Sequence, residues 1–126
     1  MSTQTAYDAL GGETAIRTLV DRFYDIMDLD EQATGIRALH PQSLDGSRQK
    51  LFDYLSYWLG GPQTYIETNG HPRMRARHMP FSIGESERDQ WLHCMQQAFT
   101  ETLPAGETRD KFWEAVQGLA DHMRNQ

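Results

Sequence analysis

The fold class follows from residues 16–27, which read Ile16-Arg17-Thr18-Leu19-Val20-Asp21-Arg22-Phe23-Tyr24-Asp25-Ile26-Met27. Six apolar or aromatic side chains recur at i, i+3, i+4, i+7, i+8 and i+11, the spacing of one face of an α-helix. They are Ile16, Leu19, Val20, Phe23, Tyr24 and Met27. We therefore expect a long amphipathic helix that begins after the pair Gly11-Gly12.

The helical period continues outside this stretch, and no segment has a convincing strand pattern. A short helix is expected over Glu31–Leu39, because His40 precedes Pro41 and is thereby pushed out of the α region. Three further long helices are expected from three apolar faces. These are Leu44, Leu51, Tyr54, Leu55 and Trp58, ended by Gly60-Gly61-Pro62; Trp91, Leu92, Met95, Ala98, Phe99 and Leu103; and Phe112, Trp113, Val116, Leu119, Ala120 and Met123.

Shorter elements connect these helices. Tyr65 is expected in a brief helical turn or loop, and a short helix is expected from Pro72 to His78, closed by Pro80. Capping signals at Ser82–Glu85 and at Ser86–Asp89 precede the third long helix. The sequence therefore predicts one all-α domain over residues 1–126, with about four substantial helices.

The composition limits the class of protein. The chain has 12 basic and 18 acidic residues, which disfavours a nucleic-acid partner. No apolar run approaches the roughly 20 residues that span a bilayer, and Met1–Asp8 shows no secretory signal. Cys94 is the only cysteine, so an internal disulfide is excluded and we expect a small buried hydrophobic residue. We expect a cytoplasmic protein without nucleic-acid or membrane partners.

The segment Gly70-His71-Pro72-Arg73-Met74-Arg75-Ala76-Arg77-His78-Met79-Pro80 stands out in this acidic chain. It holds three arginines and two histidines without one carboxylate. Such a cluster attracts an anion, and His78 offers a nitrogen to a metal, so haem, which has both a metal and carboxylates, matches both features. A solvated helix face around a core-edge histidine is the alternative, and these residues alone leave both open.

The surroundings of His78 are compatible with a haem ligand. Met74 lies on the same helix face, Arg75 is near enough to meet a ligand carboxylate, and Phe81 and Ile83 add apolar surface. Zinc, calcium and glycosidase patterns are absent from the sequence. Tyr24 and Trp91 are most simply core residues with a polar group that needs a partner. Each remaining histidine has an ordinary expected position: His40 and His71 in turns, His93 in solvent and His122 at a helix C-terminus.

Several motifs together resemble the group II truncated haemoglobins, bacterial globins with a two-over-two helical sandwich around a haem. They are Tyr7-Asp8-Ala9-Leu10-Gly11-Gly12, Phe23-Tyr24, Tyr57-Trp58-Leu59-Gly60-Gly61-Pro62, residues 70–78 and residues 87–95. The resemblance implies haem b, with His78 as the proximal iron ligand and Tyr24 and Trp91 as distal donors. It places His40 where tyrosine or phenylalanine is common, and it implies further haem contacts from Leu44, Ser47 at the distal gate, Leu51, Tyr54, Met74, Phe81 and Ile83, with Arg75 and Arg77 at the propionates.

The resemblance also implies a function. We expect reversible binding of dioxygen and other diatomic ligands, with high oxygen affinity and slow release. The alternatives are nitric-oxide dioxygenation or peroxidase-like detoxification, each needing an external reductase, and a helical interaction module without haem. A further hypothesis is that Tyr24, or else His40, coordinates ferric iron when no other ligand is present.

Overall fold

A computed structural model describes residues 4–126, apart from the side chain of Arg75. Part of the segment Met1–Asp8, in which no secretory signal was found, therefore lies outside the described residues. The described residues contain helices and connectors but no strand. The elements are α1 (Ala6–Leu10), α2 (Gly12–Leu29), the 3-10 helix η1 (Glu31–Ala33), α3 (Thr34–Ala38), α4 (Asp45–Trp58), α5 (Thr64–Asn69), α6 (Met74–His78), α7 (Glu85–Thr102) and α8 (Glu107–His122).

Helix α2 forms the centre of the core, as its periodicity predicts. All six residues of the expected apolar face are buried, and Ile16, Leu19, Val20 and Phe23 have no exposed surface at all. Burial of each such side chain contributes about 1.5–3 kcal/mol before the entropy of ordering it is subtracted. The helix begins after Gly11, whose φ of +115° is accessible to glycine and ends α1.

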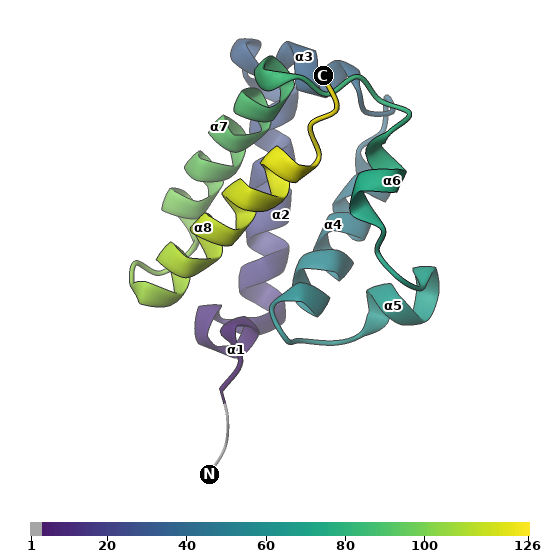
Figure 1. Ribbon diagram of the computed structural model, residues 1–126. Helices are drawn as coiled ribbons and strands as arrows, with labels where there is room; N and C mark the ends of the chain where they lie inside the picture. The colour runs from purple at the N-terminus through teal and green to yellow at the C-terminus, as the bar shows by residue number, and fades with distance from the viewer. Residues whose placement is uncertain (1–3) are drawn as a thin grey trace.

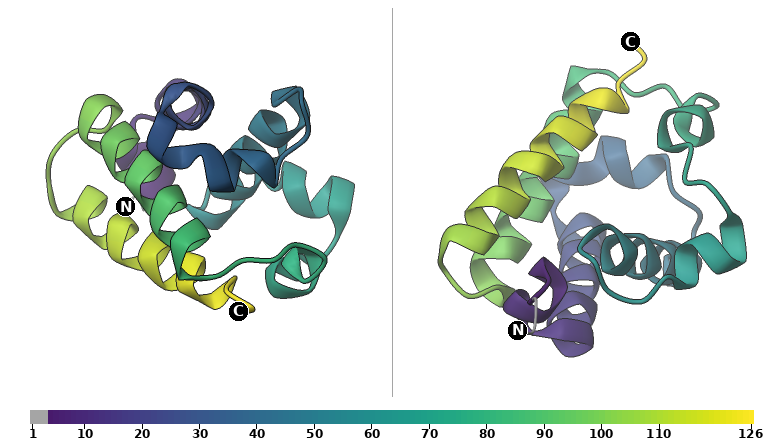
Figure 2. Two further views of the ribbon diagram at one scale, coloured as in Figure 1. Left: turned by 90° about the horizontal axis from the view of Figure 1, so that it is seen from above. Right: turned by 60° about the horizontal axis from the view of Figure 1, so that its bottom comes forward.

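The four long helices are arranged in two layers (Figure 1). Helix α2 contacts α4 and α7, and α7 contacts α8. The pair α7 and α8 lies across the pair α2 and α4, whereas α5 and α6 stand on the far side of α4 from α2, as Figure 2 shows from two directions. The structure confirms the predicted all-α, two-over-two architecture and its four long helices.

Two helices differ from the expectations. The helix α1 was not predicted, because only one of its five residues, Leu10, is buried and no apolar period develops. The helix α7 has Gly84 as its N-cap, so neither Ser82 nor Ser86 caps it. The side chain of Glu87 reaches back instead, and its Oε1 accepts a hydrogen bond of 2.8 Å from the backbone N–H of Gly84.

The turn after α4 requires glycine because α1 packs against it. The N–H of Tyr7 donates to the carbonyl of Leu59 at 3.0 Å. A Cβ at Gly61 would lie 2.7 Å from the ring of Tyr7 and 2.9 Å from the carbonyl oxygen of Ser56. Glycine therefore allows the end of α4 and the start of the chain to meet. Across residues 4–126, no helix is long and apolar enough to cross a membrane.

Candidate haem site

His78 lies at the end of α6 and is half-buried. Its Nδ1 lies 2.6 Å from the carbonyl oxygen of Met74. Because a carbonyl can only accept, Nδ1 carries the hydrogen, and the neutral imidazole keeps the lone pair of Nε2 for another partner. A backbone carbonyl that fixes the tautomer in this way is the usual support of a metal-binding histidine.

Three polar side chains from separate segments meet near one another. The ring of Tyr24, from α2, lies 5.8 Å from the ring of His40, in the turn after α3. Phe23 connects Tyr24 to Trp91 of α7, with centroid distances of 4.8 Å and 5.0 Å. The structure thus brings together residues 24, 40 and 91, which only the family resemblance had grouped. We call Tyr24, His40 and Trp91 the distal cluster.

Tyr24 and Trp91 each have an unused donor. In the described part of the chain, neither the hydroxyl of Tyr24 nor the indole N–H of Trp91 has a hydrogen-bond partner. Burial raises the pKa of Tyr24 although the positive charge of Arg48 opposes this shift, so the phenol keeps its proton at neutral pH. Both groups are therefore free to donate to a ligand placed between the helices.

His40 is fixed by a hydrogen bond to the backbone. Its Nδ1 lies 2.9 Å from the carbonyl oxygen of Ile36, so this nitrogen carries the hydrogen. Burial lowers the pKa of His40, the hydrogen bond to the carbonyl of Ile36 opposes this shift, and the positive charge of Arg37 adds to it, so the neutral ring is favoured. The Nε2 of neutral His40 is then an acceptor. The expected contact of His40 with a haem ligand stays a prediction.

Two side chains that the sequence did not single out hold His40 in place. Arg37 donates to Asp28 at 2.9 Å, to the carbonyl of Pro41 at 2.8 Å and to that of Gln42 at 2.7 Å. Gln90, next to Trp91, accepts a hydrogen bond of 3.0 Å from the backbone N–H of Ile36. Arginine and glutamine are common on protein surfaces, so nothing in the sequence marked Arg37 or Gln90.

Helix α4 contributes one face of the site. Ser47, Leu51 and Tyr54 follow at intervals of four and three residues and so share a helix face. Tyr54 is 6% exposed and stacks on Trp58, with centroids 5.9 Å apart. Ser47 and Leu51 are half-buried, and Leu44, just before the helix, is buried. This is the arrangement expected of residues along one side of a flat ligand.

Only some of the haem-contact residues predicted around α6 are buried. Met74 is half-buried and Ile83 is buried, whereas Phe81 is 43% exposed. Arg77 donates to the backbone carbonyls of Pro72 at 2.6 Å and Asn69 at 3.2 Å, so it holds the connection between α5 and α6. Its contact with a haem carboxylate stays a prediction, as does that of Arg75, whose side chain lies outside the described residues.

Asn125 fixes the loop after His78. Its Nδ2 donates to the carbonyl of Phe81 at 2.7 Å and more weakly to that of His78 at 3.4 Å. Its Oδ1 accepts from the backbone N–H of Ile83 at 3.0 Å. Sequence reasoning missed this residue because it lies 47 positions from His78 and belongs to no motif.

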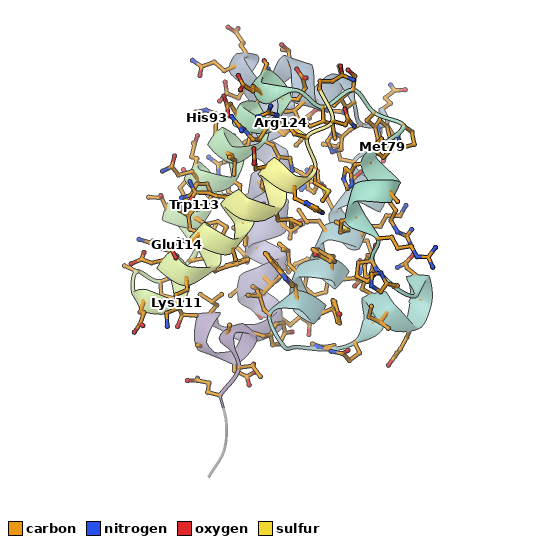
Figure 3. All side chains as sticks on the ribbon, in the orientation of Figure 1. Met79, His93, Lys111, Trp113, Glu114 and Arg124 are labelled. Carbon is orange, nitrogen blue, oxygen red and sulfur yellow. The ribbon has the colours of Figure 1, made fainter. Side chains whose placement is uncertain are left out.

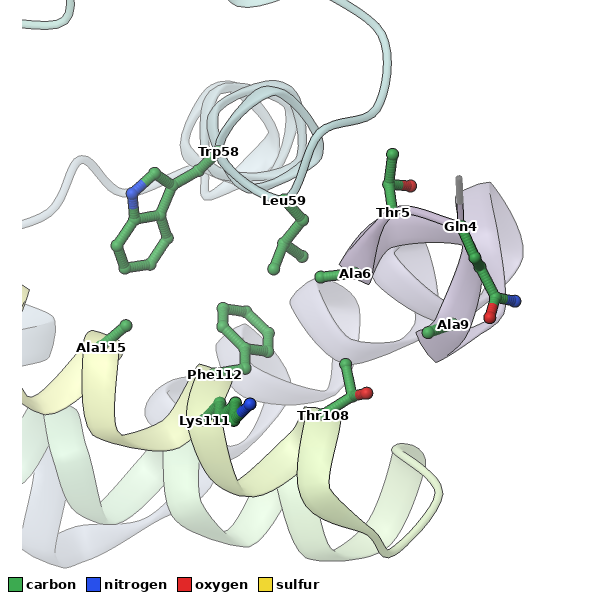
Figure 4. A pocket seen from close by; sticks show the side chains of 10 residues that line it. All are labelled: Gln4, Thr5, Ala6, Ala9, Trp58, Leu59, Thr108, Lys111, Phe112 and Ala115. Carbon is green, nitrogen blue, oxygen red and sulfur yellow. The ribbon is translucent and has the colours of Figure 1, made fainter. Parts of the chain in front are cut away.

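A separate pocket lies away from the distal cluster, between α1, the end of α4 and α8 (Figure 4). It has a volume of about 500 Å³. Trp58, Leu59 and Phe112 form its apolar wall, and the cation at its edge, Lys111, is paired with Glu107 at 2.9 Å. The pocket contains neither His78 nor a member of the distal cluster, so we do not assign the haem to it.

The fold and the site define a class of protein. Two crossed helix pairs, an imidazole with a free Nε2 and a group of polar side chains near it are the arrangement of a globin. The model of the bacterial-like globin family matches residues 5–125. The chain belongs to this family and, within it, to the group II truncated haemoglobins.

Individual relatives match over nearly the whole chain. A group 2 truncated haemoglobin of Bacillus subtilis (strain 168) is 35% identical over 99% of this chain and 92% of its own length. The group II 2-on-2 haemoglobin of Agrobacterium tumefaciens has a TM-score of 0.97 and 45% identity, covering 100% of this chain and 98% of that one. The truncated oxygen-avid haemoglobin structure from Bacillus subtilis has a TM-score of 0.89 and 34% identity, covering 97% and 100%. This chain is accordingly a globin, a haem protein that binds oxygen.

Proposed function

We propose that this protein holds haem b through Nε2 of His78 and binds dioxygen reversibly, with high affinity, on the side of the distal cluster. The observation that carries the proposal is the hydrogen bond of His78 to Met74, which leaves Nε2 as the one ring nitrogen with a free lone pair. The similarity to an oxygen-avid relative from Bacillus subtilis supports the choice of ligand.

The residues present fit the group. The half-buried imidazole can ligate an iron, and α4 supplies an apolar and aromatic side for the porphyrin. When bound, the haem supplies an iron with an open coordination position for a diatomic gas. We assign contacts to Leu44, Ser47, Leu51, Tyr54, Met74, Phe81 and Ile83, and a contact with a haem carboxylate to Arg75.

The distal cluster determines how long the ligand stays. Haem iron would lend partial negative charge to a dioxygen that it holds, and Tyr24 and Trp91 could each donate a hydrogen bond to it. A hydrogen bond to a charged acceptor contributes about 1.5–3 kcal/mol. Strong donors in a closed pocket favour slow release.

The first experiment tests the proximal ligand. The purified protein should show a sharp Soret band on addition of haemin, and the His78→Ala variant should lose it and recover a band when free imidazole is added. An unchanged Soret band in His78→Ala would exclude His78 as the ligand, whatever the affinity for oxygen.

The second experiment tests the distal donors. Tyr24→Phe and Trp91→Phe should each raise the dioxygen dissociation rate about 10- to 100-fold in stopped flow, from the loss of one hydrogen bond to a charged acceptor. Tyr65→Phe is the matched control, because Tyr65 is equally buried at 5% exposure but contacts Tyr54 instead of the distal cluster. Equal rates in all three variants would reject this account of the pocket.

A further inference from the structure

The outward side of α6 carries positive charge in an acidic protein. Three of the 12 basic residues and none of the 18 acidic ones lie in residues 70–80, so this segment carries +3 and the rest of the chain −9. Arg73, Ala76, Arg77 and Met79 are all exposed. We call these four residues the outer face of α6.

The outer face lies opposite the iron ligand. Arg73, Ala76 and Met79 are exposed, whereas Met74 and His78, four residues apart on the helix, share the half-buried side. A helix with its side chains is about 10–12 Å across. A protein bound to the outer face therefore lies about one helix diameter from the imidazole of His78.

Arg73 keeps an unfavourable backbone conformation. Its φ is +45°, and it is the single non-glycine residue with positive φ among residues 4–126. Glycine adopts this region without a steric clash, whereas the Cβ of another residue is strained there. Strain of this kind is typical of functional sites. An exposed arginine in this position indicates a use for its side chain.

The apolar part of the outer face is held outward by structure. Met79 is 55% exposed, and its backbone N–H donates to the carbonyl of Ala76 at 3.3 Å. The loop that follows is fixed by Asn125, whose amide group bonds the backbone of Phe81 and Ile83. Met79 is therefore presented on an ordered backbone, as an apolar anchor surrounded by cations, which is a common composition of a docking surface.

We propose that the outer face of α6 docks the acidic surface of an electron-transfer protein, which donates one electron for reduction of the ferric form. The proposal rests on the proposed function, because it assigns the reducing partner of the same haem. Charge complementarity selects an acidic partner, and the position of the outer face behind His78 selects a redox protein. Arg73 and Arg77 provide attraction and Met79 provides apolar contact.

The experiment uses oxidised flavodoxin, a strongly acidic one-electron protein, as the probe. Its affinity for the purified protein is measured by ¹⁵N chemical-shift titration at about 10 mM and about 150 mM salt, where the Debye length falls from about 30 Å to about 8 Å. Binding should be tighter at low salt, and the shifts should centre on residues 71–81.

Charge-reversed variants give the decisive comparison. Arg73→Glu should weaken low-salt binding about tenfold, equivalent to about 1.4 kcal/mol. Lys111→Glu, on the opposite side of the molecule in Figure 3, makes the same change in net charge and should weaken binding less than twofold. In a separate assay, reduction of the ferric protein by reduced flavodoxin, which gives up one electron, should slow in Arg73→Glu by the same factor, and reduction by dithionite should not change.

Several outcomes would overturn the proposal. The first is an equal loss of flavodoxin affinity in Arg73→Glu and Lys111→Glu, and the second is a set of chemical-shift changes centred outside residues 71–81. The third is self-association of the protein that Arg73→Glu abolishes, and the fourth is tighter binding to anionic vesicles than to flavodoxin. Failure of the proposed function gives a different signature. The Soret band would be absent, while the shift titration would still show whether this face binds the acidic probe.

Discussion

Asn125 is expected to determine how firmly the loop after His78 is held. Replacing Asn125 by alanine removes two short hydrogen bonds, from Nδ2 to the carbonyl of Phe81 at 2.7 Å and from the N–H of Ile83 to Oδ1 at 3.0 Å. The backbone bond from the N–H of Asn125 to the carbonyl of Ile83, at 2.9 Å, does not depend on the side chain and remains. The perturbation therefore acts on the loop and leaves the main-chain contact in place.

The magnitude follows from these two bonds. Each intramolecular hydrogen bond contributes about 1 kcal/mol net, and a buried N–H left without a partner costs about 1–3 kcal/mol. Ile83 is 7% exposed, so its N–H gains little from water after the substitution. We expect Asn125→Ala to lower the free energy of unfolding by about 2–3 kcal/mol. Haem release should accelerate as well, because the same side chain bonds the loop that directly follows His78.

The assay combines urea unfolding of the variant with the rate of haem transfer to an excess of apomyoglobin. Asn69→Ala is the matched control, because the amide of Asn69 bonds the carbonyl of Tyr65 within its own helix at 3.2 Å. Asn125→Asp keeps the acceptor for Ile83 but loses the donor, and should fall between the wild type and Asn125→Ala. If Asn125→Ala and Asn69→Ala agree within about 0.5 kcal/mol and lose haem equally fast, the reasoning is refuted.

Three further predictions concern groups inside the protein. Ser56→Ala should be neutral or stabilising by up to about 1 kcal/mol in thermal unfolding, because the Ser56 hydroxyl is buried without a hydrogen-bond partner among the described residues. Cys94 has no exposed surface and burial raises its pKa to about 11, so a thiol reagent should label it at neutral pH only after unfolding. Burial lowers the pKa of His40 in the folded protein. The free energy of unfolding is therefore highest above the ordinary histidine pKa near 6.5 and decreases as the pH falls below it, where the unfolded chain takes up a proton more readily. His40→Gln should flatten this decrease in a pH series of urea unfolding curves.

Much of the fold could be predicted from local pattern. The apolar face of residues 16–27 indicated α2 because helical periodicity is a property of adjacent turns, and proline and glycine marked the ends of α4 and α6 for the same local reason. The prediction of the capping residue of α7 was wrong, because the capping hydrogen bond depends on how the side chain of Glu87 folds back on Gly84. Short helices such as α1 have too few residues for a period to appear.

The sequence by itself determined the helices and the lone arginine-rich segment, and its motifs led to the prediction that His78 binds the iron. Only the tertiary structure decided that Nδ1 of His78 and Nδ1 of His40 each bond a backbone carbonyl, and that Asn125 fastens the loop after His78. The physical reason is the range of the interactions. Periodicity and turn chemistry act over a few residues, whereas a tautomer or a clamp is set by atoms that meet only after distant segments have packed.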